Sequence, residues 1–249
     1  MTSRLQPRPE TFSGKKALVI GGSGGIGKAV ALGLAELGAE LTVHGGSSRE
    51  RLETTVAAIR AVGGKANGFL LHIEDPSAAE QIFTRSPPPD ILVCAWGPFE
   101  QGKIETLDSE FWKNMVESNL IFPGILVSLA LRGMMERNWG RILLFGGTNT
   151  DNIRGFYTTT AYSAAKTALG VIAKSAAQAA GSHGVTCNVV CPGFTETEYT
   201  SEEQMRYYRE KSPLKGPMST GELAATALAI LGNPCLNGAL IPADQGVIV

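Results

Sequence analysis

The stretch Lys16-Ala17-Leu18-Val19-Ile20-Gly21-Gly22-Ser23-Gly24-Gly25-Ile26-Gly27 joins a short apolar run to a cluster of glycines. The apolar run, with its β-branched members, predicts a buried strand. The segment from Ile26 to Leu37 predicts a helix that ends at Gly38. A strand, a glycine-rich turn and a helix in this order are typical of a site that binds a dinucleotide. Glycine permits a tight turn and a close approach of the backbone to a pyrophosphate, and the helix N-terminus offers unpaired N–H groups to it.

The glycines of this turn fit two spacings. Gly22, Gly24 and Gly27 match G-x-G-x-x-G, whereas Gly21, Gly25 and Gly27 match G-x-x-x-G-x-G. The alternative is a flexible loop between a strand and a helix, without a ligand.

The rest of the chain alternates between apolar runs and helical patterns. Further strands are predicted at Leu41–His44, Ala66–Ile73, Ile91–Ala95, Arg141–Phe145, Thr186–Val190 and Leu240–Pro242. Further helices are predicted at Arg49–Val62, Ser77–Phe83, Ser109–Asn138 with a kink at Pro123-Gly124, and Thr160–Ser182. This alternation predicts an α/β fold with a single doubly wound parallel sheet and helices on both faces, which is Rossmann-like. We expect one domain over residues 1–249, with a loose arm at residues 1–13.

Composition excludes several classes of function. Of the 249 residues 43% are hydrophobic and 18% are charged, and the net charge is -1. This balance favours neither nucleic acid nor an anionic membrane surface as a partner. We find no secretory signal, and no apolar run that approaches the roughly 20 residues needed to span a bilayer. The four cysteines, Cys94, Cys187, Cys191 and Cys235, are expected to be mainly buried free thiols without a metal site, in a cytoplasmic protein.

Tyr162-Ser163-Ala164-Ala165-Lys166 carries the second chemical signal. A phenol and an amine four residues apart lie on one face of a helix. A cation near a phenol lowers the tyrosine pKa from about 10, so Tyr162 is predicted to exchange a proton with a carbonyl or an alcohol near neutral pH.

Together, the second glycine spacing, Tyr162 and Lys166 resemble the short-chain dehydrogenase/reductase family, from about Phe12 to Val249. Several other segments follow the order of that family. They are Asp90 to Gly97, Glu117-Ser118-Asn119-Leu120, Gly140-Arg141-Ile142, Pro192-Gly193-Phe194-Thr195-Glu196-Thr197, and Gly238 to Gly246.

The resemblance implies a nicotinamide cofactor and a small carbonyl or alcohol substrate. Tyr162 would be the acid/base, Lys166 would hold the ribose hydroxyls and lower the Tyr162 pKa, and Asn119 would hold a water in a proton relay. Reductases of 3-oxoacyl thioesters are the family members most similar in style, although the substrate stays open. Contacts to the cofactor are implied for Gly21, Ser23, Gly25, Ile26, Gly27, Trp96, Gly97, Tyr162, Lys166, Pro192, Gly193, Phe194, Thr195 and Thr197.

The serine that the family uses beside the tyrosine is missing. Its position falls at Gly147 when counted from Gly140, and nearer Asn149 when counted back from Tyr162. We hypothesise that the Thr148 hydroxyl replaces it as a donor to the substrate oxygen, with Asn149 as runner-up. The alternative is that no residue replaces it and the enzyme is slow or inactive.

Two further departures concern the cofactor. Cys94-Ala95-Trp96-Gly97 stands where the family has an N-N-A-G turn and keeps only the last glycine. Trp96 in this turn either reshapes the cofactor pocket or packs in the core. His72 stands where the family often has an aspartate, and either contacts the adenine or serves packing.

The end of the second strand bears on the choice of nicotinamide. Gly45 occupies the place of the acidic residue that selects NAD, and Ser47, Ser48 and Arg49 follow it. We predict that these three hold a 2′-phosphate, which favours NADP(H), with NAD(H) still possible. The alternative for this triplet is a helix N-cap with a solvated arginine.

Two surfaces complete the expectations. Residues from about 195 to 215, with mixed aromatic and charged side chains, suit a substrate lid or an ordinary surface helix. The alanine-rich helix Thr160–Ser182 and the apolar C-terminal end fit, by the resemblance, a homotetramer. The rival to an enzyme is a catalytically inactive protein that binds NADP(H) as a sensor or scaffold.

Overall fold

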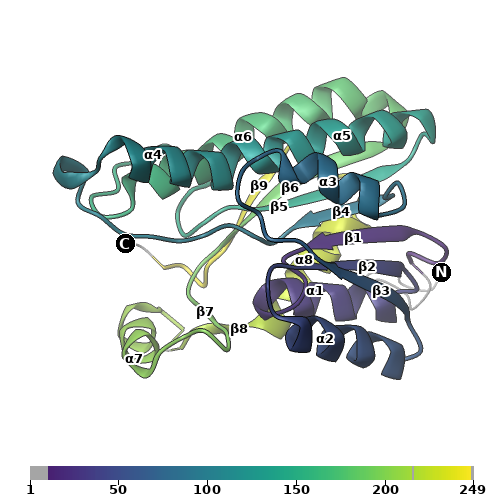
Figure 1. The fold of residues 1–249 in the computed structure, drawn as a ribbon. Helices are drawn as coiled ribbons and strands as arrows, with labels where there is room; N and C mark the ends of the chain where they lie inside the picture. Colours follow the sequence, from purple (N-terminus) through teal and green to yellow (C-terminus); the bar gives the residue numbers. More distant parts are fainter. Residues whose placement is uncertain (1–10, 215, 248–249) are drawn as a thin grey trace, which may run out of the picture.

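A seven-stranded parallel sheet forms the centre of the computed structural model, which describes residues 11–214 and 216–247. The strand order is β3-β2-β1-β4-β5-β6-β9 (Figure 1). The strands are β1 (Lys16–Ile20), β2 (Glu40–Gly45), β3 (Lys65–Leu70), β4 (Ile91–Cys94), β5 (Gly140–Phe145), β6 (Val185–Pro192) and β9 (Leu240–Ala243). The order reverses direction at β1, so the carboxyl ends of β1 and β4 flank the crevice where such sheets bind ligands.

Helices cover both faces of the sheet, which confirms the predicted doubly wound fold (Figure 1). One face carries α1 (Gly25–Glu36), α2 (Arg49–Ala61) and α8 (Thr220–Gly232), and the other carries α3 (Ala78–Arg85), α4 (Ser109–Val116), α5 (Phe122–Glu136) and α6 (Thr160–Ala180). The helix α7 (Glu202–Lys211) and the two short strands β7 (Thr195–Glu196) and β8 (Met218–Ser219) lie beyond the carboxyl ends of the main strands.

The core explains why the strands are continuous apolar runs. Val19 packs into the cluster formed with α1, α2 and α8, whereas its neighbours Leu18 and Ile20 pack into the cluster on the opposite face. Successive side chains of a strand point to opposite faces, so a sheet buried on both sides needs apolar residues at most positions of its strands.

The long helix predicted over Ser109–Asn138 is present from Ser109 to Glu136, but its irregular segment is not at the predicted position. It consists of α4 and α5, joined by a π-helical segment at Glu117–Ile121. The irregularity therefore precedes Pro123, which lies in the first turn of α5. Segments of this kind often occur at functional sites, and this one carries the buried Asn119.

The sequence also contained a helix signal that we missed. Ser219 and Glu222 form a capping box at the start of α8: the Ser219 Oγ accepts from the Glu222 N–H at 3.2 Å, and the Glu222 Oε2 accepts from the Ser219 N–H at 2.8 Å. The α8 helix packs against α1 beneath the glycine turn.

Two expectations about the termini and the membrane need correction. Phe12, placed in the loose arm, is buried, and its N–H donates to the Leu37 carbonyl at 2.8 Å; residues 1–10 of that arm lie outside the described part. By length and hydropathy alone, the segment Ser109–Glu136 could cross a bilayer, contrary to our expectation. Within it Phe122, Leu126 and Met134 are buried against the sheet, as in the core helix of a globular domain.

His44 links three strands beside the glycine turn. Its ring is fully buried, its Nδ1 accepts from the Gly21 N–H at 3.3 Å, and its Nε2 lies 2.8 Å from the Leu71 carbonyl oxygen. This pattern needs the neutral imidazole with its proton on Nε2, since a proton on Nδ1 would face the Gly21 N–H. Burial lowers the pKa of His44 from its ordinary value of 6.5.

A lowered pKa in the folded protein means that the unfolded chain binds the proton more readily. The contribution of His44 to stability is therefore fully present above pH 6.5 and is lost as the pH falls below it. We expect His44→Leu to lower the free energy of unfolding at pH 8 and to reduce its decrease between pH 7.5 and 5.5 by on the order of 1 kcal/mol. Urea denaturation at both pH values measures this. The exposed His72 supplies the control His72→Asn, and an unchanged pH dependence in His44→Leu would contradict the assignment.

Candidate active site

The backbone of the glycine turn selects one of the two spacings. Gly21 and Gly25 have φ angles of +74° and +50°, in the left-handed region that favours glycine. A Cβ on Gly27 would overlap the Gly21 carbonyl oxygen, so α1 can pack this closely only on a glycine. The conformation thus requires Gly21, Gly25 and Gly27, which are the glycines of the G-x-x-x-G-x-G spacing.

A cavity of about 420 Å³ opens above this turn. Among the residues singled out from the sequence, it is lined by Gly21, Ser23, Gly25, Ile26, Ser47, Ser48, Trp96, Gly97 and Thr197. Arg51 and Tyr199 also line it, and neither was predicted. We call this space the dinucleotide cavity.

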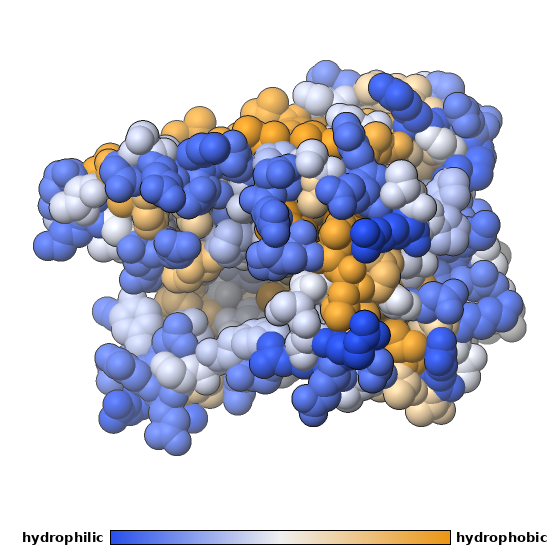
Figure 2. Space-filling view, viewed as in Figure 1, coloured by the Kyte–Doolittle hydropathy of each residue, from blue (hydrophilic) through white to orange (hydrophobic). Residues whose placement is uncertain are grey.

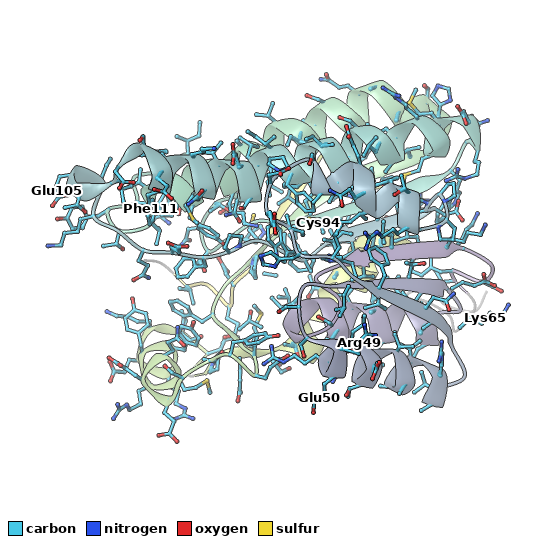
Figure 3. All side chains as sticks on the ribbon, in the orientation of Figure 1. Arg49, Glu50, Lys65, Cys94, Glu105 and Phe111 are labelled. Atoms are coloured by element: carbon cyan, nitrogen blue, oxygen red, sulfur yellow. The ribbon has the colours of Figure 1, made fainter. Side chains whose placement is uncertain are left out.

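Arg49 and His72, predicted for the 2′-phosphate and the adenine, do not line the dinucleotide cavity. Arg49 is largely exposed and lies 3.7 Å from Glu53, and its label in Figure 3 stands with that of Glu50 over α2. His72 is exposed and does not line the cavity. Ser48 is the N-cap of α2, and its Oγ accepts from the Arg51 N–H at 3.3 Å. Arg49 and Arg51 both lie in the first turn of this helix, and only Arg51 lines the cavity.

Trp96 does both things that the sequence left open. It lines the dinucleotide cavity and packs edge-on against Phe122, with ring centroids 5.2 Å apart. Beside it, Gly97 lines the same cavity, and a Cβ at Gly97 would overlap the Asn119 Oδ1. A dinucleotide in this cavity would therefore contact a bulky indole ring at Trp96 and bare backbone at Gly97.

A second cavity, of about 460 Å³, lies between the α4 side of the molecule and α7, where Figure 2 shows the surface hollowed. We call it the substrate cavity. It is lined by seven aromatic side chains, by Thr148, Pro192 and Gly193, and by further small or polar residues. The aromatic residues are Phe99, Phe156, Tyr157, Tyr162, Phe194, Tyr207 and Tyr208.

Tyr162 meets the substrate cavity from α6. Its ring packs edge-on against Phe99, with centroids 4.9 Å apart. On the other side it fits against Gly147, where a Cβ would lie 2.9 Å from the Tyr162 Cε1 and 3.1 Å from its hydroxyl oxygen. At Gly147, one of the two positions counted for the family serine, the Tyr162 ring thus occupies the space that a side chain would need.

Lys166 is buried one helical turn after Tyr162. Its Nζ donates to the Phe145 carbonyl at 3.0 Å and lies 5.6 Å from the Tyr162 ring centroid. Burial lowers the pKa of Lys166 to about 8, against the opposing effect of the nearby Cys94 and Cys191 thiols. At neutral pH the amine is therefore mostly protonated.

The expected lowering of the Tyr162 pKa is wrong for this structure. Its pKa is raised, first by burial and then by the charge that Cys191 would carry as a thiolate. The Lys166 ammonium is bonded to the Phe145 carbonyl and does not offset this burial. Tyr162 thus holds its proton at neutral pH.

Asn119 stands behind the pair. Its Nδ2 donates to the Pro98 carbonyl at 3.0 Å, while its Oδ1 is buried and has no hydrogen-bond partner among the described residues. The Oδ1 and the Lys166 Nζ both border the space in which a Cβ of Gly97 would lie. A buried acceptor without a partner, next to a cation, fits a small polar group such as a hydroxyl or a water.

The loop before α6 separates the two candidates for the serine role. Thr148 lines the substrate cavity, and its hydroxyl donates to the Pro192 carbonyl at 3.1 Å. Asn149 is buried with a φ of +57°, its Nδ2 has no partner among the described residues, and it does not line the cavity. The buried Thr150, which was not singled out, holds the loop by accepting from the Gly147 N–H at 2.8 Å. The geometry therefore favours Thr148.

Three of the four cysteines are buried. Cys94, Cys187 and Cys191 are buried free thiols, whereas Cys235 is exposed. Cys94 lies at the carboxyl end of β4, near the centre of the molecule in Figure 3. Within residues 11–214 and 216–247, no group of three or more His, Cys, Asp or Glu side chains could hold a metal ion.

The residues present fit a nicotinamide dinucleotide. The glycine turn offers a phosphate cradle at the N-terminus of α1, and Asn119 with Lys166 offers an unpaired acceptor and a cation at the other end. The predicted contacts Pro192, Gly193, Phe194 and Thr195 run from the last residue of β6 to the first residue of β7. The Thr195 hydroxyl donates to the Gly193 carbonyl at 3.2 Å.

Comparisons with known proteins agree with this geometry. The family model described as short chain dehydrogenase matches residues 15–207. The 3-oxoacyl-[acyl-carrier-protein] reductase FabG of Escherichia coli is 32% identical over 229 residues, with 89% of this chain and 91% of that protein covered. A 2-dehydro-3-deoxy-D-gluconate 5-dehydrogenase of Formosa agariphila is 25% identical, with 94% and 93% covered.

Among solved structures, a 3-oxoacyl (acyl-carrier-protein) reductase from Agrobacterium tumefaciens with NADP bound is similar, with a TM-score of 0.88 and 26% identity. The match covers 96% of this chain and 97% of that one. From its fold, its site and these similarities, the chain belongs to the short-chain dehydrogenase/reductase family of NAD(P)-dependent oxidoreductases, which act on CH–OH and C=O groups.

Proposed function

We propose that this protein reduces a neutral, largely apolar carbonyl compound with NADPH, and that Tyr162 donates the proton. One observation carries the proposal. The Tyr162 side chain lines an uncharged aromatic cavity, while Lys166 and Asn119 lie behind it beside the dinucleotide cavity. Tyr162, the proposed acid, thus faces the substrate cavity, and Lys166 and Asn119, the groups proposed to hold the cofactor, lie on its other side. A carbonyl compound bound in the substrate cavity could therefore meet both the nicotinamide and the Tyr162 hydroxyl.

The bound nicotinamide supplies the hydride, and the residues of this chain bind, orient and transfer the proton. Tyr162 gives its proton to the carbonyl oxygen. The Lys166 ammonium would hold the ribose hydroxyls and stabilise the negative charge that develops on the Tyr162 oxygen. The Asn119 Oδ1 would accept a hydrogen bond from a water that returns the proton. The Thr148 hydroxyl turns from Pro192 to the substrate oxygen. The backbone at Phe194 and the hydroxyl of Thr195 or Thr197 would orient the carboxamide.

The raised pKa of Tyr162 favours the direction of reduction. A phenol that keeps its proton at neutral pH is ready to act as a donor, whereas oxidation of an alcohol needs the phenolate. We infer that carbonyl reduction is the easier direction at pH 7 and that oxidation gains as the pH rises.

The lining of the substrate cavity limits the substrate class. Among the described residues, no Asp, Glu, Lys, Arg or His lines it, and its polar groups are hydroxyls and the amides of Gln101 and Gln204. A free carboxylate placed here would lose its hydration without a cation to replace it. Aryl or alicyclic ketones therefore fit better than acidic sugars of the kind named for the Formosa relative.

NADP(H) is the preferred cofactor in this proposal. Gly45 stands at the position where an NAD-selective site has an acidic residue. Ser47 and Ser48 line the dinucleotide cavity together with Arg51. Arg51 takes the role first given to Arg49, because its side chain is the one that borders this space. A guanidinium and two hydroxyls can hold a 2′-phosphate through charge-assisted hydrogen bonds.

Assembly and location complete the proposal. Ile121 and Val171 are exposed apolar residues on the face that α5 and α6 form, where Figure 2 shows hydrophobic side chains along the upper edge. A homotetramer that buries this face is expected from the resemblance. The free thiols fit the reducing cytoplasm.

The choice between Arg51 and Arg49 can be tested by cofactor binding. We expect Arg51→Gln to weaken NADPH binding about tenfold and to leave NADH binding nearly unchanged, because only NADPH carries the 2′-phosphate. Arg49→Gln, two residues away and outside the cavity, should change neither. Tryptophan fluorescence titrations measure both affinities. An equal loss for NADPH and NADH in Arg51→Gln would refute the assignment.

The proposed reaction can be tested with a panel of neutral aryl ketones, 3-oxoacyl thioesters and keto acids, following NADPH absorbance. We expect turnover with neutral ketones, loss of at least 10³-fold in Tyr162→Phe, and a loss of at least tenfold in Thr148→Ala that Thr148→Ser partly restores. NADPH affinity should stay within about twofold of wild type in all three variants. Tight NADPH binding without turnover of any ketone would instead favour the sensor or scaffold.

A further inference from the structure

The carboxylate of Glu198 lies on the phosphate cradle of the glycine turn. The N–H of Gly25, the first residue of α1, donates to the Glu198 Oε1 at 2.9 Å and to its Oε2 at 3.1 Å. Both carboxylate oxygens thus share one of the N–H groups that a helix leaves unpaired at its start. An anion at this end of a helix is stabilised by the helix dipole, which is the effect that a dinucleotide phosphate uses.

The turn is shaped to admit this carboxylate. A Cβ on Gly24 would lie 2.6 Å from the Glu198 Oε1 and would overlap the Tyr199 hydroxyl. The lack of a side chain at Gly24 therefore lets Glu198 and Tyr199 reach the backbone of the turn.

Tyr199 makes a second contact with the cofactor-binding residues. The Arg51 Nη1 donates to the Tyr199 hydroxyl at 3.0 Å, and the Arg51 guanidinium carbon lies 4.9 Å from the centre of the Tyr199 ring. Two consecutive residues, Glu198 and Tyr199, thus engage the phosphate cradle and the cation proposed for the 2′-phosphate.

Residues 197–200 form a compact turn that can move as a unit. The Thr197 N–H donates to the Thr200 Oγ1 at 3.0 Å, and the Thr200 N–H donates to the Thr197 carbonyl at 3.0 Å. The turn lies between β7, which pairs with β8, and α7, which begins at the Ser201 capping box. We call residues 197–200 the strap.

Space and a cation are available for the displaced carboxylate. A cavity of about 480 Å³ beside the strap is lined by Glu198, by the cations Lys28 and Arg51, and by the acid Glu50. Lys28 belongs to α1, one turn after Gly25. The Glu198 side chain can leave Gly25 and stay near a positive charge.

We propose that Glu198 is a built-in competitor for the dinucleotide phosphates, which occupies their cradle until the cofactor displaces the strap. The inference rests on the proposed function for the identity of the cofactor. Its consequence is that the carboxylate weakens the affinity for NADP(H) by the fraction of molecules in which the cradle is closed. Removal of the carboxylate should therefore tighten cofactor binding, whereas removal of an ordinary ligand residue would weaken it.

The test compares Glu198→Gln with Glu196→Gln by titration of NADPH. Glu196 is an exposed acid two residues earlier, so its variant removes the same charge from the same segment without a contact to Gly25. We expect Glu198→Gln to bind NADPH about two- to fivefold more tightly, mainly through a faster association rate, and Glu196→Gln to bind like wild type. Stopped-flow fluorescence gives both rates, and thermal unfolding checks that the variants fold.

The contrary outcomes are distinct. Equal or weaker NADPH binding by Glu198→Gln, or equal tightening by Glu196→Gln, would overturn the inference. If no variant binds NADPH or NADH, the proposed function fails, and calorimetric titration with inorganic pyrophosphate then decides the inference alone. Tighter pyrophosphate binding by Glu198→Gln would support it, and unchanged binding would overturn it.

Discussion

The hydrogen bond from the buried Lys166 Nζ to the Phe145 carbonyl is the constraint on which the site depends. It ties α6 to the carboxyl end of β5, and in doing so fixes Tyr162 one turn earlier against Gly147 and Phe99. The same amine borders the space at Gly97 that Asn119 reaches from the π-helical segment. A buried amine is costly unless it is paired or bonded, so the surrounding elements can shift little without exposing or stranding it.

Electrostatics differ at the two ends of the cofactor site. Near Tyr162, burial dominates, so the phenol keeps its proton and the Lys166 pKa falls to about 8. At the glycine turn, the groups are exposed to solvent, and a single carboxylate can compete with phosphate for Gly25. Burial thus governs the proton-transfer end, whereas exposed anion binding governs the end where the cofactor enters. The Arg51–Tyr199 contact connects the strap to the residues that would read the 2′-phosphate.

The fold was predictable because it rests on local patterns: buried strands that are mostly apolar, and glycines whose φ angles only glycine adopts readily. The placement of Tyr162 and Lys166 one turn apart on α6 was predictable for the same reason, since four residues span about one helical turn. The sequence did not allow us to choose Arg51 over Arg49 as the arginine beside the cavity, because that choice depends on where the Ser48 cap starts α2. The raised pKa of Tyr162 and the reach of Glu198 to Gly25, 173 positions earlier, arise from packing and could not be inferred from spacing.

The central claim is that this chain transfers hydride to a carbonyl with Tyr162 as the acid. The most direct measurement uses NADPH deuterated at C4 of the nicotinamide, with a neutral aryl ketone, and locates the deuterium in the product by mass spectrometry. The account predicts deuterium on the carbinol carbon with wild type and none above background with Tyr162→Phe, although both proteins bind NADPH. Saturated NADPH binding with no deuterium in any carbonyl compound of the panel would contradict it and identify the chain as a protein that binds the cofactor without turnover.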